Sequence, residues 1–235
     1  MHEGAVSARL GFKGMPAAGE EEMIARDIDL VRQTGGPLHI AHISTAGAVE
    51  LVRRAKEEGL PVTCEVLTHH FALTDEEVDR RGTDAKMSPP LRGEADVAAM
   101  IRGLADNTID TIATDHAPHT AIEKQLPFEE APMGIVGLET AVGLTLTHLV
   151  HTGALPLMHA VDKWTRMPAD ILRLPGGRFN SGCLGDVTII DPDLLWTVNA
   201  ETFRSKSRNT PFDGCQMRGK AVVTVVGGRI VHDER

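Results

Sequence analysis

A carboxylate and two imidazoles stand within five positions of each other, directly after a short apolar run. Asp115, His116 and His119 belong to the string ATDHAPH, which follows TIDTI. A carboxylate at such a place can hold a divalent metal ion and also move the proton of a metal-bound water, because the metal makes that water a nucleophile near neutral pH. The alternative is that Asp115 caps a turn and the histidines lie at the surface.

A second string, LHIAHIS over residues 38–44, contains two histidines three positions apart. Side chains three apart in a strand face opposite sides, so His39 and His42 cannot both point into one site. His42 lies nearer the strand end and is the better candidate for a ligand, although a packing role fits the same pattern. His39 lies deeper in the strand, and we expect it to be a hydrogen-bonded core or packing residue. His69 and His70 follow the next expected strand; we expect these adjacent side chains to diverge, and assign them no catalytic role.

Two further strings can present hydrogen bonds to a ligand. Residues 86–92, KMSPPLR, place the hydroxyl of Ser88 before two prolines that fix an extended loop. Residues 131–140, APMGIVGLET, include Met133 and Gly134, and glycines here allow backbone amides to approach a ligand closely. A rigid structural loop and a simple turn explain these two patterns equally well.

Three strand and helix units must position these strings. Apolar runs predict strands near residues 38–43, 62–66 and 109–114, and helical stripes of apolar residues alternate with them. Such alternation indicates a parallel sheet, either open and doubly wound or part of a (β/α) barrel. Polar residues directly after each strand favour the barrel, whose active site forms at the carboxyl ends of its strands.

The pattern changes after about residue 175. Short apolar runs separated by glycine and aspartate, GDVTIID at 185–191 and AVVTVVGGRIV at 221–231, predict a small β unit. We therefore expect an α/β chain with a partial barrel over residues 1–175 and an accessory β unit over residues 176–235.

Composition excludes several classes of function. Lys and Arg total 24 against 33 for Asp and Glu, and the net charge of -9 leaves no basic patch for nucleic acid. The three cysteines show no CxxC spacing, so neither a disulfide framework nor a thiolate zinc site is expected. No apolar run is long enough for a membrane span, and the first residues lack the form of a signal peptide. We expect a cytoplasmic protein that binds neither nucleic acid nor membrane.

Five strings resemble, in order and spacing, the class I dihydroorotases of the amidohydrolase superfamily: AHIST, KMSPPLR, DNTIDTIATDHAPH, APMGIVGLET and SKSRNTPFDG. Hydantoinases and allantoinases share some of these elements, but ATDHAPH followed by GIVGLET is strongly like dihydroorotase. The resemblance implies the C-terminal part of a (β/α)8 TIM barrel with a β-sandwich unit. It also implies a zinc-dependent enzyme that interconverts N-carbamoyl-L-aspartate and L-dihydroorotate in pyrimidine biosynthesis.

The resemblance also assigns roles to residues. His42 resembles a ligand of the more buried metal, and Asp115 resembles a ligand of the other metal and the catalytic acid/base. The positions that resemble substrate contacts are Ser88, His119, Met133 and Gly134. Many members of the family have asparagine where Ser88 stands.

The HxH and HCED-like elements, which supply further metal ligands in this family, do not occur in the chain. We expect a fragment with an incomplete ligand set for its one or two Zn²⁺ ions, inactive alone. Its expected partners are the small-molecule substrate and a complementary N-terminal fragment, a second copy or an aspartate carbamoyltransferase. Two alternatives are a noncatalytic structural partner of that transferase and a hydantoinase or allantoinase. The presence of His42, Asp115 and His119 favours the enzyme.

Overall fold

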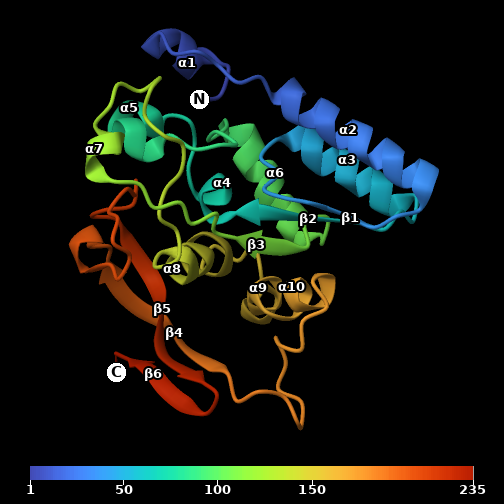
Figure 1. Cartoon of the computed structure of the whole chain (residues 1–235), viewed down its shortest axis with the longest axis vertical. Coiled ribbons are helices and arrows are strands. Elements are labelled where there is room, and N and C mark those ends of the chain that lie inside the picture. The colour runs from blue at the N-terminus through green and yellow to red at the C-terminus, as the bar shows by residue number, and fades with distance from the viewer. Residues whose placement is uncertain (235) are drawn as a thin grey trace. The chain divides into compact units, whose positions relative to one another are not determined.

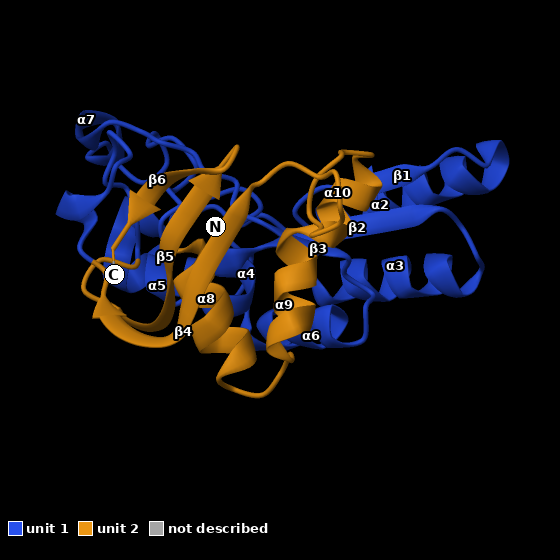
Figure 2. Cartoon of the chain, turned by 90° about the horizontal axis from the view of Figure 1, so that it is seen from below, with its two compact units in different colours: residues 1–139, 199–211 blue, residues 140–198, 212–235 orange. Residues whose placement is uncertain are grey.

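A computed structural model describes residues 1–234 (Figure 1). The chain forms two compact units, one of residues 1–139 and 199–211 and the other of residues 140–198 and 212–235 (Figure 2). The chain therefore leaves the first unit, returns to it, and leaves it again. The predicted boundary near residue 175 separates the barrel from the β unit in the whole expected protein, and it stays a prediction.

The first unit contains a parallel sheet with the strand order β1-β2-β3. Its strands are β1 (Leu38–Ile40), β2 (Val62–Leu67) and β3 (Thr111–Ala113). The three predicted parallel strands are confirmed, although β1 and β3 are shorter than expected. β1 ends early because the backbone turns into a left-handed conformation at His42.

Helices link these strands in the right order for a βαβ arrangement. The helical segments of this unit are α1 (Ala5–Leu10), α2 (Ala17–Thr34), α3 (Ala46–Glu57), α4 (Thr68–Ala72), α5 (Glu77–Arg81), η1 (Gly82–Ala85), α6 (Glu94–Ala105), α7 (Ala121–Lys124) and η3 (Ala200–Thr202). α3 packs against both α2 and α6. Ile24, Ile28 and Val31 recur at helical spacing along α2 and are buried, so the apolar stripe of this helix forms part of the core.

The second unit contains α8 (Ala141–Thr145), the π-helical turn η2 (Leu146–Val150), α9 (Leu157–Trp164) and α10 (Arg166–Ile171). Its sheet is antiparallel, with the order β4-β5-β6. The strands are β4 (Val187–Thr197), β5 (Gln216–Val226) and β6 (Arg229–Asp233). Gly227 and Gly228 form the hairpin turn with φ of 55° and 77°, as such turns require. The small β unit predicted for the C-terminal part is confirmed.

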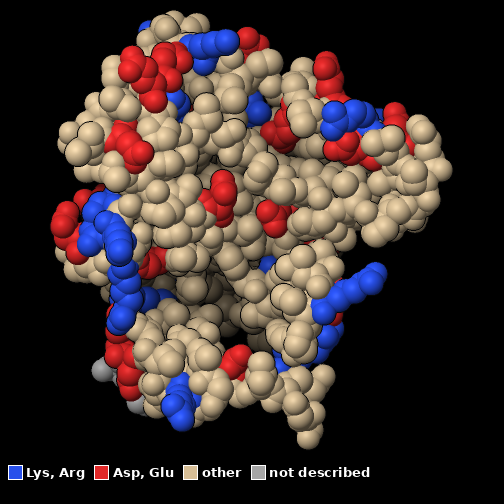
Figure 3. Space-filling model, viewed as in Figure 1, with Lys and Arg blue, Asp and Glu red and all other residues tan. Residues whose placement is uncertain are grey.

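On the face drawn in Figure 3, a run of Lys and Arg side chains lies along the left side with acidic side chains next to it, and most of the remaining surface is uncharged. The described residues include no helix with the length and apolar character of a membrane span.

Candidate functional site

His42 lies two residues beyond the end of β1, in a strained backbone conformation. Its backbone angle φ is 41°, a value that residues other than glycine rarely adopt. The following amide, Ile43 N, donates to the carbonyl of Glu65 at 3.0 Å and so ties this turn to β2. His39, in contrast, lies on β1 and contacts Thr63 Oγ1 through Nδ1 at 2.9 Å. His39 is therefore hydrogen-bonded, as expected, but it is not part of the core.

Asp115 occupies the equivalent place after β3. It lies two residues beyond the strand, it is exposed, and its φ is 47°. Within residues 1–234, the non-glycine positions with positive φ are His42, Asn107, Asp115 and Arg173. Half of them are therefore the two predicted metal-binding positions. Backbone strain of this kind collects at functional sites, where the surrounding structure maintains it.

The parallel sheet places His42 and Asp115 at the same end of its strands, the carboxyl end. β2 lies between β1 and β3, and the carboxyl ends of parallel strands point the same way. Two strand spacings of about 4.8 Å separate the two outer strands. Convergence of the two side chains in one site remains a prediction.

His69 and His70 are fully buried in α4, directly after β2. Their ring centroids lie 4.5 Å apart in an edge-on arrangement, so the expectation that they diverge is wrong. The short α4 turn brings the two rings together. His70 Nε2 lies 3.0 Å from the carbonyl oxygen of Pro89, which identifies Nε2 as the donor.

Burial keeps both rings neutral at pH 7. Desolvation, followed by the influence of His70 and His42, holds the pKa of His69 well below its usual value. Desolvation also lowers the pKa of His70 to about 4. Both nitrogens of His69 and Nδ1 of His70 have no hydrogen-bond partner in the described structure. Buried polar atoms without partners are costly, and native proteins keep few of them. In the sequence, the only sign of this buried histidine pair was two adjacent histidines directly after a strand.

Asn209 joins the two loops that carry most of the predicted substrate contacts. Its Nδ2 donates to the carbonyls of Ala117 at 2.9 Å and Gly134 at 3.1 Å. Its Oδ1 accepts from the amide of His119 at 3.2 Å, and its carbonyl accepts from Val136 N at 3.0 Å. Asn209 lies in the SKSRNTPFDG string, but no local pattern in the sequence marks it as a site residue.

His119, Met133 and Gly134 are brought together. His119 Nε2 lies 3.0 Å from the carbonyl oxygen of Met133, and the Met133 side chain is exposed. Gly134 has a φ of 125°, and a Cβ at this position would lie 2.5 Å from Ala117 Cβ and 3.3 Å from His119 Nε2. Only glycine fits this close approach.

Two buried lysines hold the same loops through backbone carbonyls. Lys86 Nζ donates to Phe128 at 2.5 Å and to Ala131 at 2.6 Å, while the Lys86 carbonyl accepts from Gly134 N at 2.9 Å. Desolvation lowers the pKa of Lys86. Ser88, two residues further along, is exposed. The Lys86 anchor therefore fixes the loop that presents Ser88.

Lys124 forms the second anchor. Its Nζ donates to the carbonyls of Pro132 at 3.1 Å and Gly134 at 3.0 Å. Burial lowers its pKa from 10.5 to about 8. The carbonyl of Gly134 thus accepts hydrogen bonds from both Lys124 and Asn209, which hold the loop that contains Met133 and Gly134.

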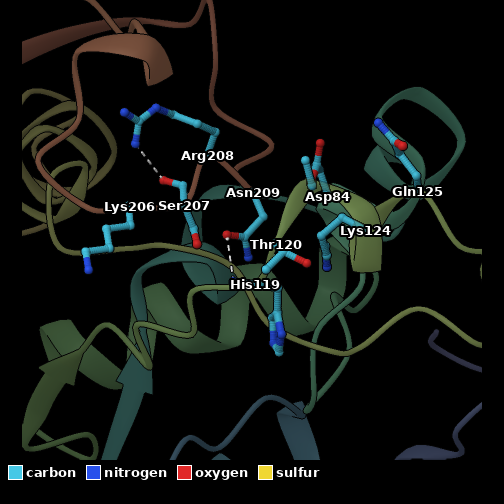
Figure 4. Close-up of a pocket in the computed structure, with 10 residues that line it drawn as sticks. Asp84, His119, Thr120, Lys124, Gln125, Lys206, Ser207, Arg208 and Asn209 are labelled. Carbon is cyan, nitrogen blue, oxygen red and sulfur yellow. Dashed lines mark hydrogen bonds between the residues drawn. The ribbon is translucent and has the colours of Figure 1, made fainter.

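A pocket of about 450 Å³ opens beside this loop assembly (Figure 4). Asn209 lies next to the backbone of His119 at its wall, and Arg208 folds back onto the carbonyl of Ser207. Lys124, Lys206 and Arg208 contribute three basic side chains to the lining, against the single carboxylate of Asp84. This charge balance favours an anionic ligand. His42 and Asp115 do not line this pocket.

The residues present do not by themselves complete a metal site. No three His, Cys, Asp or Glu side chains in residues 1–234 lie close enough together to hold an ion. A durable zinc site needs about three protein ligands. His42 and Asp115 could contribute only two donors, so we derive no chemical step through a metal from this chain.

Comparisons with known proteins identify the family to which the chain is similar. The Amidohydrolase family matches residues 1–231. A dihydroorotase from Pelotomaculum thermopropionicum is 55% identical over 235 residues, covering 100% of this chain and 55% of that protein. A dihydroorotase from Anaeromyxobacter dehalogenans strain 2CP-C is 52% identical, covering 100% of this chain and 54% of that protein. The chain thus spans about half the length of the curated relatives it matches.

Solved structures with a similar fold are hydantoinases. The L-hydantoinase (dihydropyrimidinase) from Arthrobacter aurescens matches with a TM-score of 0.89 at 31% identity, over 94% of this chain and 50% of that one. A D-hydantoinase from Thermus sp. matches with a TM-score of 0.86 at 28% identity, over 92% and 49%. These neighbours have the metal-dependent hydrolase barrel, of which β1, β2 and β3 form a part. The family in question consists generally of metal-dependent hydrolases, and the match over almost every residue shows that this chain belongs to the amidohydrolase family.

Proposed function

We propose that the protein to which this chain belongs is a dihydroorotase, which reversibly cyclises N-carbamoyl-L-aspartate to L-dihydroorotate in pyrimidine biosynthesis. The observation that carries the proposal is the identity of 50–55% with proteins named dihydroorotase across essentially the whole chain. The hydantoinase structures reach 31% at most among the neighbours reported above.

In this proposal Asp115 is the acid/base that takes a proton from the attacking water and returns it to the departing amide nitrogen. Its exposure at the end of β3 leaves the carboxylate accessible to substrate. His42 and Asp115 would each also give one donor to Zn²⁺, and the remaining donors would come from outside residues 1–234. Zinc as the cofactor is therefore part of the proposal.

Ser88, His119, Met133 and Gly134 are the proposed substrate contacts. The bond from His119 Nε2 to the Met133 carbonyl fixes the ring so that Nδ1 is left to face a ligand. The close approach at Gly134 brings the main chain to the same place. A small substrate would then be bound by one imidazole, one hydroxyl and main-chain groups on loops that Asn209 and the two lysines hold.

We further propose that the active form, in the cytoplasm, includes a segment equivalent to the part of the related dihydroorotases that this chain does not match. The support is the coverage of 54–55% of the related dihydroorotases. A homo-oligomer and a complex with aspartate carbamoyltransferase are the other proposed assemblies.

The test is an assay of dihydroorotate hydrolysis with Zn²⁺, using the purified chain with and without a separately produced segment. This segment is the unmatched part of the Pelotomaculum thermopropionicum dihydroorotase. We expect activity only in the mixture, and its loss in Asp115→Asn. Hydrolysis of hydantoin or dihydrouracil but not of dihydroorotate would favour the hydantoinase alternative, which the match to a hydantoinase at 31% identity fits. No activity toward any of the three would favour the noncatalytic partner.

A further inference from the structure

The loop that follows His42 is held by a buried ion pair from two distant segments. Glu20 lies in the first turn of α2, and Arg92 ends the KMSPPLR string. Arg92 Nη2 lies 3.3 Å from Glu20 Oε2, and the two side chains are only 4% and 13% exposed. Two charges this far from water persist only when both are paired and hydrogen-bonded.

The Glu20 carboxylate takes up the donors immediately after His42. Its Oε1 accepts from Ser44 N at 2.7 Å and from Thr45 N at 3.1 Å, and its Oε2 accepts from the Ser44 hydroxyl. These amides directly precede the 12-residue helix α3, whose N-cap is Thr45, and a negative charge is favourable at this end of a helix. The carboxylate thus fixes the backbone directly behind the imidazole of His42.

Arg92 completes the clamp from the other side. Its Nε donates to Ser44 Oγ at 3.0 Å, and its Nη1 donates to the Met15 carbonyl at 2.9 Å. The same Nη1 lies 3.2 Å from His2 Nδ1, which is therefore the acceptor. Because Arg92 belongs to the loop of Ser88, the pair connects two segments that carry predicted site residues.

His42 needs such support. Its left-handed backbone is unfavourable for a residue with a Cβ and persists only where neighbouring contacts determine it. Glu65 holds Ile43 N from the side of β2, and Asp96 Oδ1 accepts from Ala46 N at 2.8 Å. Between these two fixed points, the conformation of the loop depends on Glu20.

We propose that Glu20 and Arg92 are positioning residues. Their ion pair fixes the backbone of the residues that follow His42 and so orients its imidazole toward the carboxyl end of the parallel strands. The inference rests on the proposed function only for the role of His42 as a ligand. The ion pair itself would then act through His42 and touch neither metal nor substrate.

The test uses nuclear magnetic resonance on the 235-residue chain. Glu20→Gln keeps the shape of the side chain but removes its charge and leaves one oxygen to accept. We expect the amides of Ser44 and Thr45 to exchange with solvent about tenfold faster or more, because charged hydrogen bonds are lost. The ring signals of His42 should shift, while those of His39 stay in place. Arg92→Lys keeps the charge without the fork and should give a smaller change in the same signals.

The matched control is Asp110→Asn, which breaks a different partly buried pair in the same unit. Asp110 Oδ2 lies 2.7 Å from Lys56 Nζ and accepts from Cys64 N at 2.8 Å, at the opposite end of the sheet. It should speed exchange at Cys64 and leave His42 unchanged. The proposal is overturned if Glu20→Gln leaves the His42 ring signals unaltered, or if Asp110→Asn moves them equally. These outcomes do not depend on dihydroorotate hydrolysis, so the inference and the proposed function can fail separately.

Discussion

His42 and Asp115 adopt the same left-handed backbone conformation at equivalent places, each two residues beyond the end of an outer strand of the parallel sheet. Neither residue is glycine, the residue for which a positive φ carries no steric cost. We infer that these two positions need the imidazole and the carboxylate themselves, because glycine would fit the backbone conformation better. This separation of conformational cost from side-chain role can be tested by substitution.

His42→Gly should give a more stable protein than His42→Ala, by about 1 kcal/mol in the free energy of unfolding. Both variants lose the imidazole, but only glycine relieves the positive φ. Urea denaturation of the two variants measures the difference. Asn107, with a φ of 66° and no role in the site, is the matched position, and the same order should hold for Asn107→Gly and Asn107→Ala. Equal stability of the two His42 variants would contradict the strain argument.

Asn209→Ala should destabilise the protein by about 2–3 kcal/mol, because three side-chain hydrogen bonds to two loops are lost and their partners are buried or half-buried. Asn209→Asp should be about as damaging, since a carboxylate cannot donate to the carbonyls of Ala117 and Gly134. Thermal unfolding gives both values. Asn199, whose side chain caps the exposed start of η3, is the control and should cost about 1 kcal/mol or less.

Gly134→Ala should destabilise the loop by more than strain alone explains. The new Cβ would meet Ala117 Cβ at 2.5 Å in addition to adopting an unfavourable φ. Gly153→Ala has a positive φ of 79° with nothing within 4 Å, so it gives the cost of a left-handed φ without a clash. The φ of 125° at Gly134 is itself less favourable for alanine, so the clash is measured separately by a double variant. We expect Gly134→Ala to be the worse of the two by about 1 kcal/mol or more in calorimetry. Adding Ala117→Gly should recover part of that excess, and a failure to do so would place the clash elsewhere.

Stability should rise with pH above about 8 because of Lys124. Burial lowers its pKa from 10.5 to about 8, so between these values the unfolded chain binds a proton that the folded chain does not. The free energy of unfolding therefore increases through this window, by up to about 3 kcal/mol, and is flat with respect to Lys124 below it. Buried Lys86, whose pKa is also lowered, acts in the same direction.

Urea denaturation at a series of pH values tests this dependence. Lys124→Met should reduce the rise without abolishing it, since Lys86 remains. Lys206→Met, at an exposed position in the same pocket, should leave the slope as it is. A Lys124→Met protein with the full slope would show that other groups cause the rise. The chain contains no tyrosine, which removes one competing titration.

Local sequence pattern predicted the strands and the positions of His42 and Asp115, because a short apolar run followed by a polar residue is complete within a few positions. The contacts that organise the site were not predictable in this way. Asn209 reaches His119 across 90 residues, and Arg92 reaches Glu20 across 72, so no local periodicity marks either pair. The packing of His69 against His70 was missed because adjacent residues were expected to point apart, which holds for a strand but not for the turn of α4.

The bond between Asn209 and His119 also constrains the order of events during synthesis. The amide of His119 finds its acceptor only after 90 further residues have been made, a delay of roughly 5–20 s at ordinary rates of elongation. In that interval the second unit emerges almost up to β5, while the loops around Gly134 lack one of their anchors. A nascent chain stalled before residue 209 should therefore present these loops to proteases, whereas one released after it should protect them.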